Sequence, residues 1–218
     1  MFYPIPSVII AKLLINKEAG TLPDQSLVSC FIHQSYGNSH SFNIAMITLL
    51  VEENNPLTPS FYNDLINNLQ FHQLTCPCGH SGCLSVHGYY NRSVKLPCGK
   101  VTFRICRAIC EHCGHTHAIL LSSMVPYSQV SASDQAAIID NFNHHVPQDP
   151  VMDRNPCIDE SCYRYIIRCY LRYWHEKLLS ERVILSPLRQ LITSCFSHFR
   201  RQFMQIKNTP NILFLNTT

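Results

Sequence analysis

The clearest pattern of apolar and polar positions lies in the last third of the chain and predicts two amphipathic helices. Apolar residues recur at steps of three and four over 163–178, after Asp159 as the N-cap residue. A second stripe occupies 188–203, after Ser186 as N-cap and Pro187 at the first helical position. We therefore expect the C-terminal part to be mainly α-helical, with an arrangement of the helix-turn-helix kind.

A period of two predicts a β-hairpin in the middle of the chain. Residues 86–109 are rich in β-branched and aromatic residues, and they flank a turn-prone Leu-Pro-Cys-Gly-Lys at 96–100. In the second strand Phe103 and Ile105 are apolar, as expected when one face is buried. Arg104 lies between them and should point away from the core.

The remaining segments carry weaker patterns. Apolar stretches at 8–15 and 44–51 and a helix-like spacing near Phe61 predict a helical N-terminal segment over residues 1–75. Ser131 begins a capping box for a short helix that should end near residue 142. The proline-rich stretch that follows, 143–156, is expected to be a loop.

Twelve cysteines place the chain in a reducing compartment, since the N-terminus lacks the basic leader of a secretory signal. We expect a cytoplasmic protein. No apolar run approaches the roughly 18 residues of a membrane span, so no membrane association is expected. Seven of the cysteines fall within residues 76–113, and clustered thiols in such a compartment indicate a metal site.

Two cysteine knuckles flank the hairpin and predict a zinc ribbon with Zn²⁺ as cofactor. Cys-x-x-Cys-Gly at 110–114 is the standard form, and Cys-Pro-Cys-Gly at 76–79 begins the second knuckle with one residue fewer. Because of that shorter spacing, the sequence does not decide which four of five cysteines bind the ion, and His80 and His87 are alternative imidazole ligands. The candidate metal ligands are Cys76, Cys78, Cys83, Cys110 and Cys113.

Other residues of the cluster are expected to do no metal chemistry. Cys98 in the turn and Cys106 in the second strand are interpreted as structural. The histidines His112, His115 and His117 are expected to be solvated or hydrogen-bonded rather than ligands.

The net charge of +3 divides into blocks of opposite sign. Residues 76–117 hold five basic and one acidic residue, and 151–218 hold ten and five, whereas 1–75 and 118–150 are acidic. This segregation suits a polyanionic partner, although two solvated basic faces would give the same numbers. The candidate nucleic-acid-binding residues are Arg92, Lys95, Arg104 and Arg107 on the hairpin and Arg164, Arg168 and Arg172 on one ridge of the first C-terminal helix.

Three groups of residues carry a resemblance to known protein families. They are Cys76-Pro77-Cys78-Gly79, then His87-Gly88-Tyr89-Tyr90 with Arg92, and then Arg104, Arg107, Cys110, Cys113 and Gly114. Residues 76 to about 130 resemble a bacterial family of domains of unknown function and, more distantly, the N-terminal zinc ribbon of insertion-sequence transposases. The resemblance implies DNA binding through the ribbon and the helices. Transposases also carry three catalytic carboxylates on an RNase-H-like fold, but the C-terminal acids here crowd into one loop and one helical region, so no catalysis is expected.

The sequence thus predicts an α+β protein in three parts: a helical segment at 1–75, a zinc-ribbon domain at 76–130 and a helical region at 131–218. Its expected function is DNA binding linked to mobile elements or transcription, without a catalytic residue or a small-molecule substrate. A zinc-stabilised protein-interaction module that binds no nucleic acid is the alternative.

Overall fold

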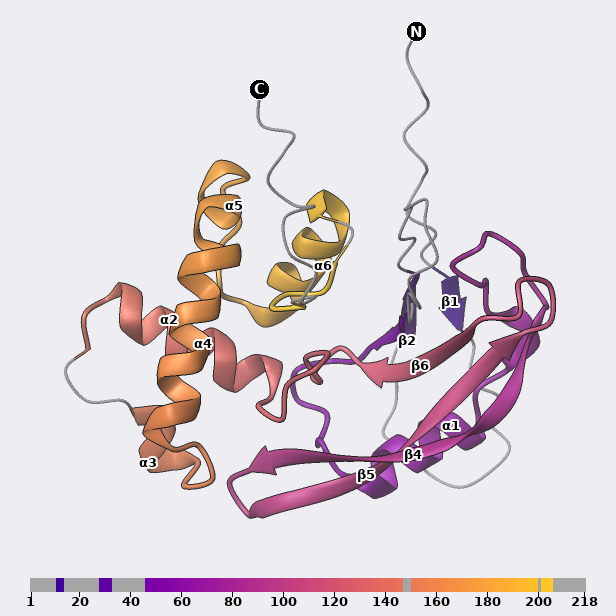
Figure 1. Cartoon of the computed structure of the whole chain (residues 1–218), viewed down its shortest axis with the longest axis horizontal. Coiled ribbons are helices and arrows are strands. Elements are labelled where there is room, and N and C mark those ends of the chain that lie inside the picture. Colours follow the sequence, from indigo (N-terminus) through magenta and orange to yellow (C-terminus); the bar gives the residue numbers. More distant parts are fainter. Residues whose placement is uncertain (1–10, 14–27, 33–45, 147–149, 200, 206–218) are drawn as a thin grey trace, which may run out of the picture.

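The computed structural model has an α+β architecture, with a mixed sheet and a group of helices (Figure 1). It describes residues 11–13, 28–32, 46–146, 150–199 and 201–205. The strands are β1 (Ala11–Leu13), β2 (Val28–Ile32), β3 (Met46–Leu50), β4 (Leu84–Leu96), β5 (Gly99–Cys110) and β6 (Thr116–Leu121). Their order in the sheet is β1-β2-β3-β6-β5-β4, in which β3 and β6 pair parallel and the other neighbours antiparallel.

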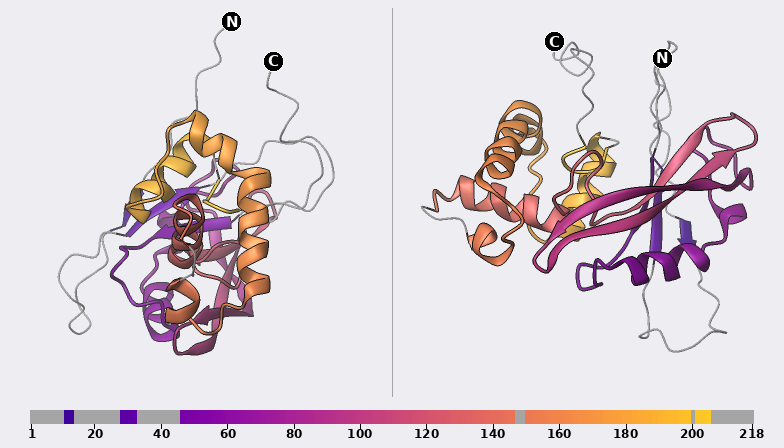
Figure 2. Two further views of the ribbon diagram at one scale, coloured as in Figure 1. Left: turned by 90° about the vertical axis from the view of Figure 1, so that its left-hand side faces the viewer. Right: turned by 60° about the horizontal axis from the view of Figure 1, so that its bottom comes forward.

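Six α-helices and one 3₁₀ turn are found in the described residues. They are α1 (Pro59–Asn67), η1 (Phe71–Gln73), α2 (Ala132–Asn143), α3 (Pro150–Arg154), α4 (Glu160–Tyr173), α5 (His175–Ser180) and α6 (Leu188–Phe199). Figure 2 shows α2 to α6 gathered at one end of the molecule, beside the sheet. None of these helices is long and apolar enough to cross a membrane.

The described part of residues 1–75 corrects the expectation of a helical segment. The helix near Phe61 is confirmed as α1, but the apolar stretch at 44–51 forms β3, and β1 lies in the stretch at 8–15. All five residues of β3 are buried, since the strand lies between β2 and β6 and contacts α6 through Leu50. A short strand buried on both faces has no alternation to distinguish it from a helix.

The predicted hairpin is confirmed. Strands β4 and β5 pair from Leu84 opposite Cys110 to Leu96 opposite Gly99, which leaves a two-residue turn. Gly99 has φ +127°, a conformation that side chains disfavour. Phe103 is buried and the neighbouring Arg104 is exposed, as the alternation predicts.

A tyrosine hydroxyl replaces one rung of the ladder between β5 and β6. The two strands pair from Arg107 opposite Ala118, and the next pair in register would be Cys106 and Ile119. The Tyr62 hydroxyl of α1 instead accepts the Cys106 N–H at 2.9 Å and donates to the Ile119 carbonyl at 2.9 Å. Figure 1 shows the strands separating beyond this point. Tyr62 is fully buried, which raises its pKa and keeps it a neutral donor.

The helical half follows the predicted caps Ser131 and Asp159, whereas α6 begins at Leu188, after the expected first helical position Pro187. The helix lengths also differ from the predicted ones. Asp159 accepts the Cys162 N–H at 2.8 Å at the start of α4, as expected. The apolar stripe over 163–178 is divided between α4 and α5, because the backbone at Trp174 leaves the helical region. The expected loop at 143–156 contains α3, and Asn155 after it donates to the Asp134 carboxylate at 3.0 Å.

The described residues form two large hydrophobic cores and a small cluster of Leu50, Ile192 and Phe196. One joins buried residues from Met46 to Met124 and lies between the sheet and α1, so residues 46–74 share a core with the ribbon. The other joins residues from Val125 to Met204 among the helices.

Replacing the N-cap Ser131 by Ala is expected to lower the free energy of unfolding by about 1–2 kcal/mol. The Ser131 hydroxyl accepts the Asp134 N–H at 3.1 Å and lies 3.0 Å from the Asp134 carboxylate, so its loss leaves buried groups of α2 unpaired. Denaturant unfolding measures the change. The control Ser197→Ala, on an exposed position of α6, should stay within about 0.5 kcal/mol of wild type. Equal stabilities of the two variants would contradict this role of the cap.

Candidate metal centre

Four cysteine thiols from the two knuckles meet at one point. The Sγ atoms of Cys76, Cys78, Cys110 and Cys113 all lie within 4.8 Å of one another. The Sγ atoms of Cys76 and Cys113 are 3.8 Å apart, and those of Cys78 and Cys110 are also 3.8 Å apart. Thiolates at about 2.3 Å from a tetrahedral ion are separated by about 3.8 Å. The four cysteines therefore form a site with the dimensions of a tetrahedral metal centre.

The second knuckle, between β5 and β6, is held by a short set of backbone hydrogen bonds. The Gly114 N–H donates to the Cys110 carbonyl at 2.8 Å, and the Cys110 N–H donates to the His115 carbonyl at 3.0 Å. The Cys113 N–H points at the Cys110 sulfur, 3.4 Å away. Gly114 has φ +69°, which explains the glycine after the second cysteine.

The first knuckle repeats this arrangement with one residue fewer. The Gly79 N–H donates to the Cys76 carbonyl at 2.8 Å, the Cys76 N–H donates to the His80 carbonyl at 2.8 Å, and the Cys78 N–H lies 3.5 Å from the Cys76 sulfur. Gly79 has φ +95°. The single-residue spacing, which leaves the ligand assignment open in the sequence, is therefore a shortened knuckle that delivers both of its thiols.

Cys83 lies beside the centre and outside the tetrad. Its Sγ is 3.2 Å from the Cys110 Sγ and 3.2 Å from the His80 carbonyl oxygen. Burial and the contact with Cys110 raise the pKa of Cys83 to about 11, which favours the thiol. The structure thus places the fifth candidate ligand as a neighbour of Cys110.

The electrostatics favour a thiolate at Cys110. Burial opposes ionisation there, but the Cys113 N–H and the neighbouring thiols lower the pKa of Cys110 to about 6. Burial raises the pKa of Cys76, which is fully enclosed. The thiolate is the form that binds a metal, and the lowered pKa favours the thiolate of Cys110 near neutral pH.

The histidines of the second knuckle and β6 divide between the two expected environments, since His112 and His115 are exposed and His117 is buried with a hydrogen-bond contact. His117 is only 2% exposed, and its Nε2 lies 3.3 Å from the Cys76 sulfur. A buried imidazole beside a metal-binding sulfur is a typical second-layer contact that fixes the ligand. Its place in β6, ahead of a fully apolar run, is the sequence signal for burial. His112 is exposed and stacks on the exposed His80, with ring centroids 3.3 Å apart, whereas His87 lies exposed in β4.

Two of the seven candidate nucleic-acid-binding residues make contacts inside the protein. Arg92 donates to the carbonyls of Val125 and Ser128, and the Lys95 ammonium lies 3.5 Å from Asp159 and 2.9 Å from a cysteine sulfur. Both join the hairpin to the helical half and are only partly exposed. They act as structural links.

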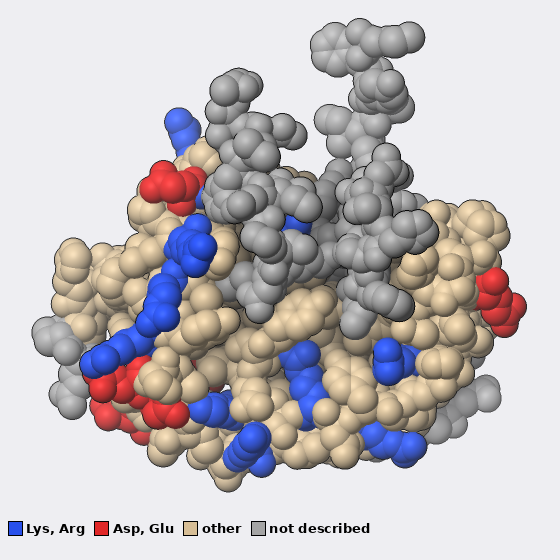
Figure 3. Space-filling model, in the orientation of Figure 1, with Lys and Arg blue, Asp and Glu red and all other residues tan. Residues whose placement is uncertain are grey.

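The other five lie at the surface. Arg104 is stacked over the Tyr89 ring at 4.2 Å, and Arg107 is half-buried in β5. The ridge residues of α4, Arg164, Arg168 and Arg172, are exposed, and Arg164 pairs with Glu160 at 2.6 Å. Figure 3 shows a line of basic side chains along α4 and further ones over the hairpin on the same face.

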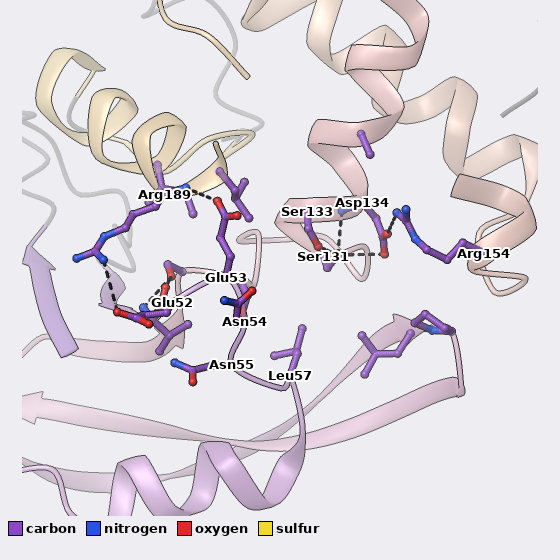
Figure 4. A pocket seen from close by; sticks show the side chains of 18 residues that line it. Glu52, Glu53, Asn54, Asn55, Leu57, Ser131, Ser133, Asp134, Arg154 and Arg189 are labelled. Atoms are coloured by element: carbon purple, nitrogen blue, oxygen red, sulfur yellow. Dashed lines mark hydrogen bonds and ion pairs between the residues drawn. The ribbon is translucent and has the colours of Figure 1, made fainter. Parts of the chain in front are cut away.

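A pocket of about 570 Å³ lies apart from the cysteines, between the segment after β3, the hairpin turn and the helices α2, α3 and α6. Its charged residues pair with one another (Figure 4). Glu53 accepts the Arg189 N–H at 2.7 Å, Glu52 lies 3.6 Å from the Arg189 guanidinium, and Asp134 pairs with Arg154 at 3.0 Å. The contacts of Arg189 join α6 to the segment after β3, whereas the Asp134–Arg154 pair joins α2 to α3 within the helical half.

A family model described as a domain of unknown function, DUF6431, matches residues 76–165. This match includes both knuckles, the hairpin, α2, α3 and the first turns of α4. No curated protein and no solved structure matches the chain. The similarity therefore covers the metal centre together with its junction to the helices.

Proposed function

We propose that the four cysteines hold a structural Zn²⁺ and that the protein binds double-stranded DNA through one basic face. Four thiolates at tetrahedral spacing suit zinc, and a closed Cys₄ centre leaves no position for a reacting water. The ion would then join the two knuckles and fix the base of the hairpin. This supports a binding protein rather than an enzyme, located in a reducing compartment such as the cytoplasm.

The observation that carries the DNA proposal is the line of exposed basic side chains along α4, on a face where the hairpin also carries basic side chains (Figure 3). Arg164, Arg168 and Arg172 are spaced one turn apart and exposed, so they can follow a phosphate backbone. Arg104, exposed in β5 and stacked on the Tyr89 ring, offers a further phosphate contact from the hairpin. The resemblance to transposase zinc ribbons supports a link to mobile elements or transcription.

A protein partner is the second candidate, because the helical half also exposes large apolar side chains. Tyr165 and Leu171 on α4, Leu179 on α5 and Ile184 after it are 49–61% exposed. Such residues commonly contribute to protein interfaces. The interaction-module alternative would use this surface and would bind DNA only weakly.

The affinity for a fluorescent mixed-sequence duplex, measured as salt is raised, tests the proposal. The zinc-loaded protein should lose affinity steeply, with a slope of about 0.9 per phosphate contact on logarithmic axes. The double variant Arg168→Ala/Arg172→Ala should bind more weakly and reduce that slope by about two, because two phosphate contacts are lost. Glu160→Gln should strengthen binding, since it frees Arg164 from its ion pair.

Arg182→Ala is the matched control, because it removes an exposed arginine outside the ridge. Its salt slope should equal that of wild type. Negligible binding at low salt with zinc present would reject the DNA proposal in favour of the interaction module. Equal slopes for the double variant and the control would remove the α4 ridge from the interface.

A further inference from the structure

We propose a second metal site, formed by Cys78, His80 and His112, that shares the Cys78 thiolate with the Cys₄ centre. It rests on the proposed zinc function, because the first ion positions Cys78. The ligand atoms of the three residues all lie within 4.8 Å of one another, and all three residues are exposed. They form a group on the solvent side of the tetrad.

The distances fit one ion of the zinc type. The Cys78 Sγ and the His80 Nδ1 are 3.6 Å apart. A sulfur at about 2.3 Å and a nitrogen at about 2.0–2.1 Å from a tetrahedral ion are separated by about 3.6 Å. One thiolate and two imidazoles suit a borderline divalent cation, and the fourth position would face solvent.

The backbone fixes both histidines at this point. His80 lies in the first knuckle, where its carbonyl accepts the Cys76 N–H, and His112 lies in the second knuckle. The Glu111 N–H donates to the Cys83 carbonyl at 2.8 Å, which holds the second knuckle against the segment after the first. The stacking of the two rings is therefore a consequence of how the knuckles close.

Charge also favours a second cation. Four thiolates around one divalent ion leave a net charge of about −2 on the centre, and a second divalent ion sharing one thiolate would neutralise it. Because the second site is exposed and has only three protein ligands, it should release its ion more readily than the tetrad. The second ion would thus be a labile one.

Metal stoichiometry of the full chain tests this inference. The reduced protein is titrated with Co²⁺, freed of excess metal by gel filtration, and its metal content is measured by mass spectrometry. Wild type should hold two ions per chain, whereas His80→Ala and His112→Ala should each hold one. The d–d absorption of the tetrathiolate ion should remain in both variants. A chelator of moderate affinity should remove the second ion first.

His115→Ala is the control, because His115 is exposed in the same knuckle but outside the group, and it should keep two ions. One ion per chain in wild type, with tetrathiolate absorption, would overturn the second site and leave the zinc proposal intact. Two ions in both histidine variants would also overturn it, since the second ion would then lie elsewhere. A wild-type chain that binds none would overturn the zinc proposal itself.

Discussion

Cys110→Ser is expected to abolish tight metal binding and to unfold the ribbon. Structural zinc sites contribute about 10–16 kcal/mol of apparent binding free energy at neutral pH, which is comparable to the whole stability of a typical domain. Cys110 lies at the centre of the site, where its sulfur contacts those of Cys78 and Cys83 and accepts a backbone N–H. Zinc content and the cooperativity of thermal unfolding, followed by circular dichroism, measure the effect.

Two controls separate loss of metal from loss of a cysteine. Cys98→Ser changes an exposed thiol in the hairpin turn and should alter the stability by less than about 0.5 kcal/mol. A strong chelator added to wild type should reproduce the unfolding of Cys110→Ser. A Cys110→Ser protein that keeps one zinc ion and the wild-type melting temperature would exclude the tetrad as the main ligand set.

Tyr62→Phe is expected to lower the free energy of unfolding by about 2–4 kcal/mol, although it removes a single oxygen atom. That oxygen accepts the Cys106 N–H and donates to the Ile119 carbonyl, so the hydroxyl joins the two strands where they no longer pair directly. Its removal leaves one buried N–H and one buried carbonyl unpaired, at about 1–3 kcal/mol each. Urea unfolding of the zinc-loaded protein measures the change.

The matched control is Tyr89→Phe, which removes a hydroxyl from a 43% exposed tyrosine and keeps the ring under Arg104. It should differ from wild type by less than about 0.5 kcal/mol. If the two tyrosine variants were equally stable, the hydrogen bonds of the Tyr62 hydroxyl would contribute nothing to the free energy of unfolding.

The sequence is sufficient for elements whose signal is local. The hairpin and the caps Ser131 and Asp159 depend on residues close in sequence, and the confirmed hairpin in turn brings the two knuckles at its base together. The four candidate ligands could be identified only from the structure, because the choice between Cys78 and Cys83 depends on loop conformation rather than on spacing.

The N-terminal part could not be predicted because its signal is long-range. Strand β3 is an apolar run that pairs with β2 and, beyond the whole hairpin, with β6, and its burial on both faces leaves no alternation that marks it as a strand. The roles of Arg92 and Lys95 are hidden for the same reason, since their partners Val125 and Asp159 lie in the helical half. A basic residue on a strand is equally consistent with a surface and with a link to another part of the chain.

The parallel pairing of β3 with β6 would give a metal bound at the four cysteines a role in the order of folding. Residues 51–115 must be closed into a loop before Ile47 can meet Ile119, and pairings so distant in sequence are slow to form. A metal that already joins Cys76 to Cys113 would leave about half of that loop to close. Each halving of a flexible loop lowers its closure cost by about 0.6 kcal/mol. The ribbon would thereby act as a kinetic template, assembled from local contacts first, on which the distant strands of the sheet then pair.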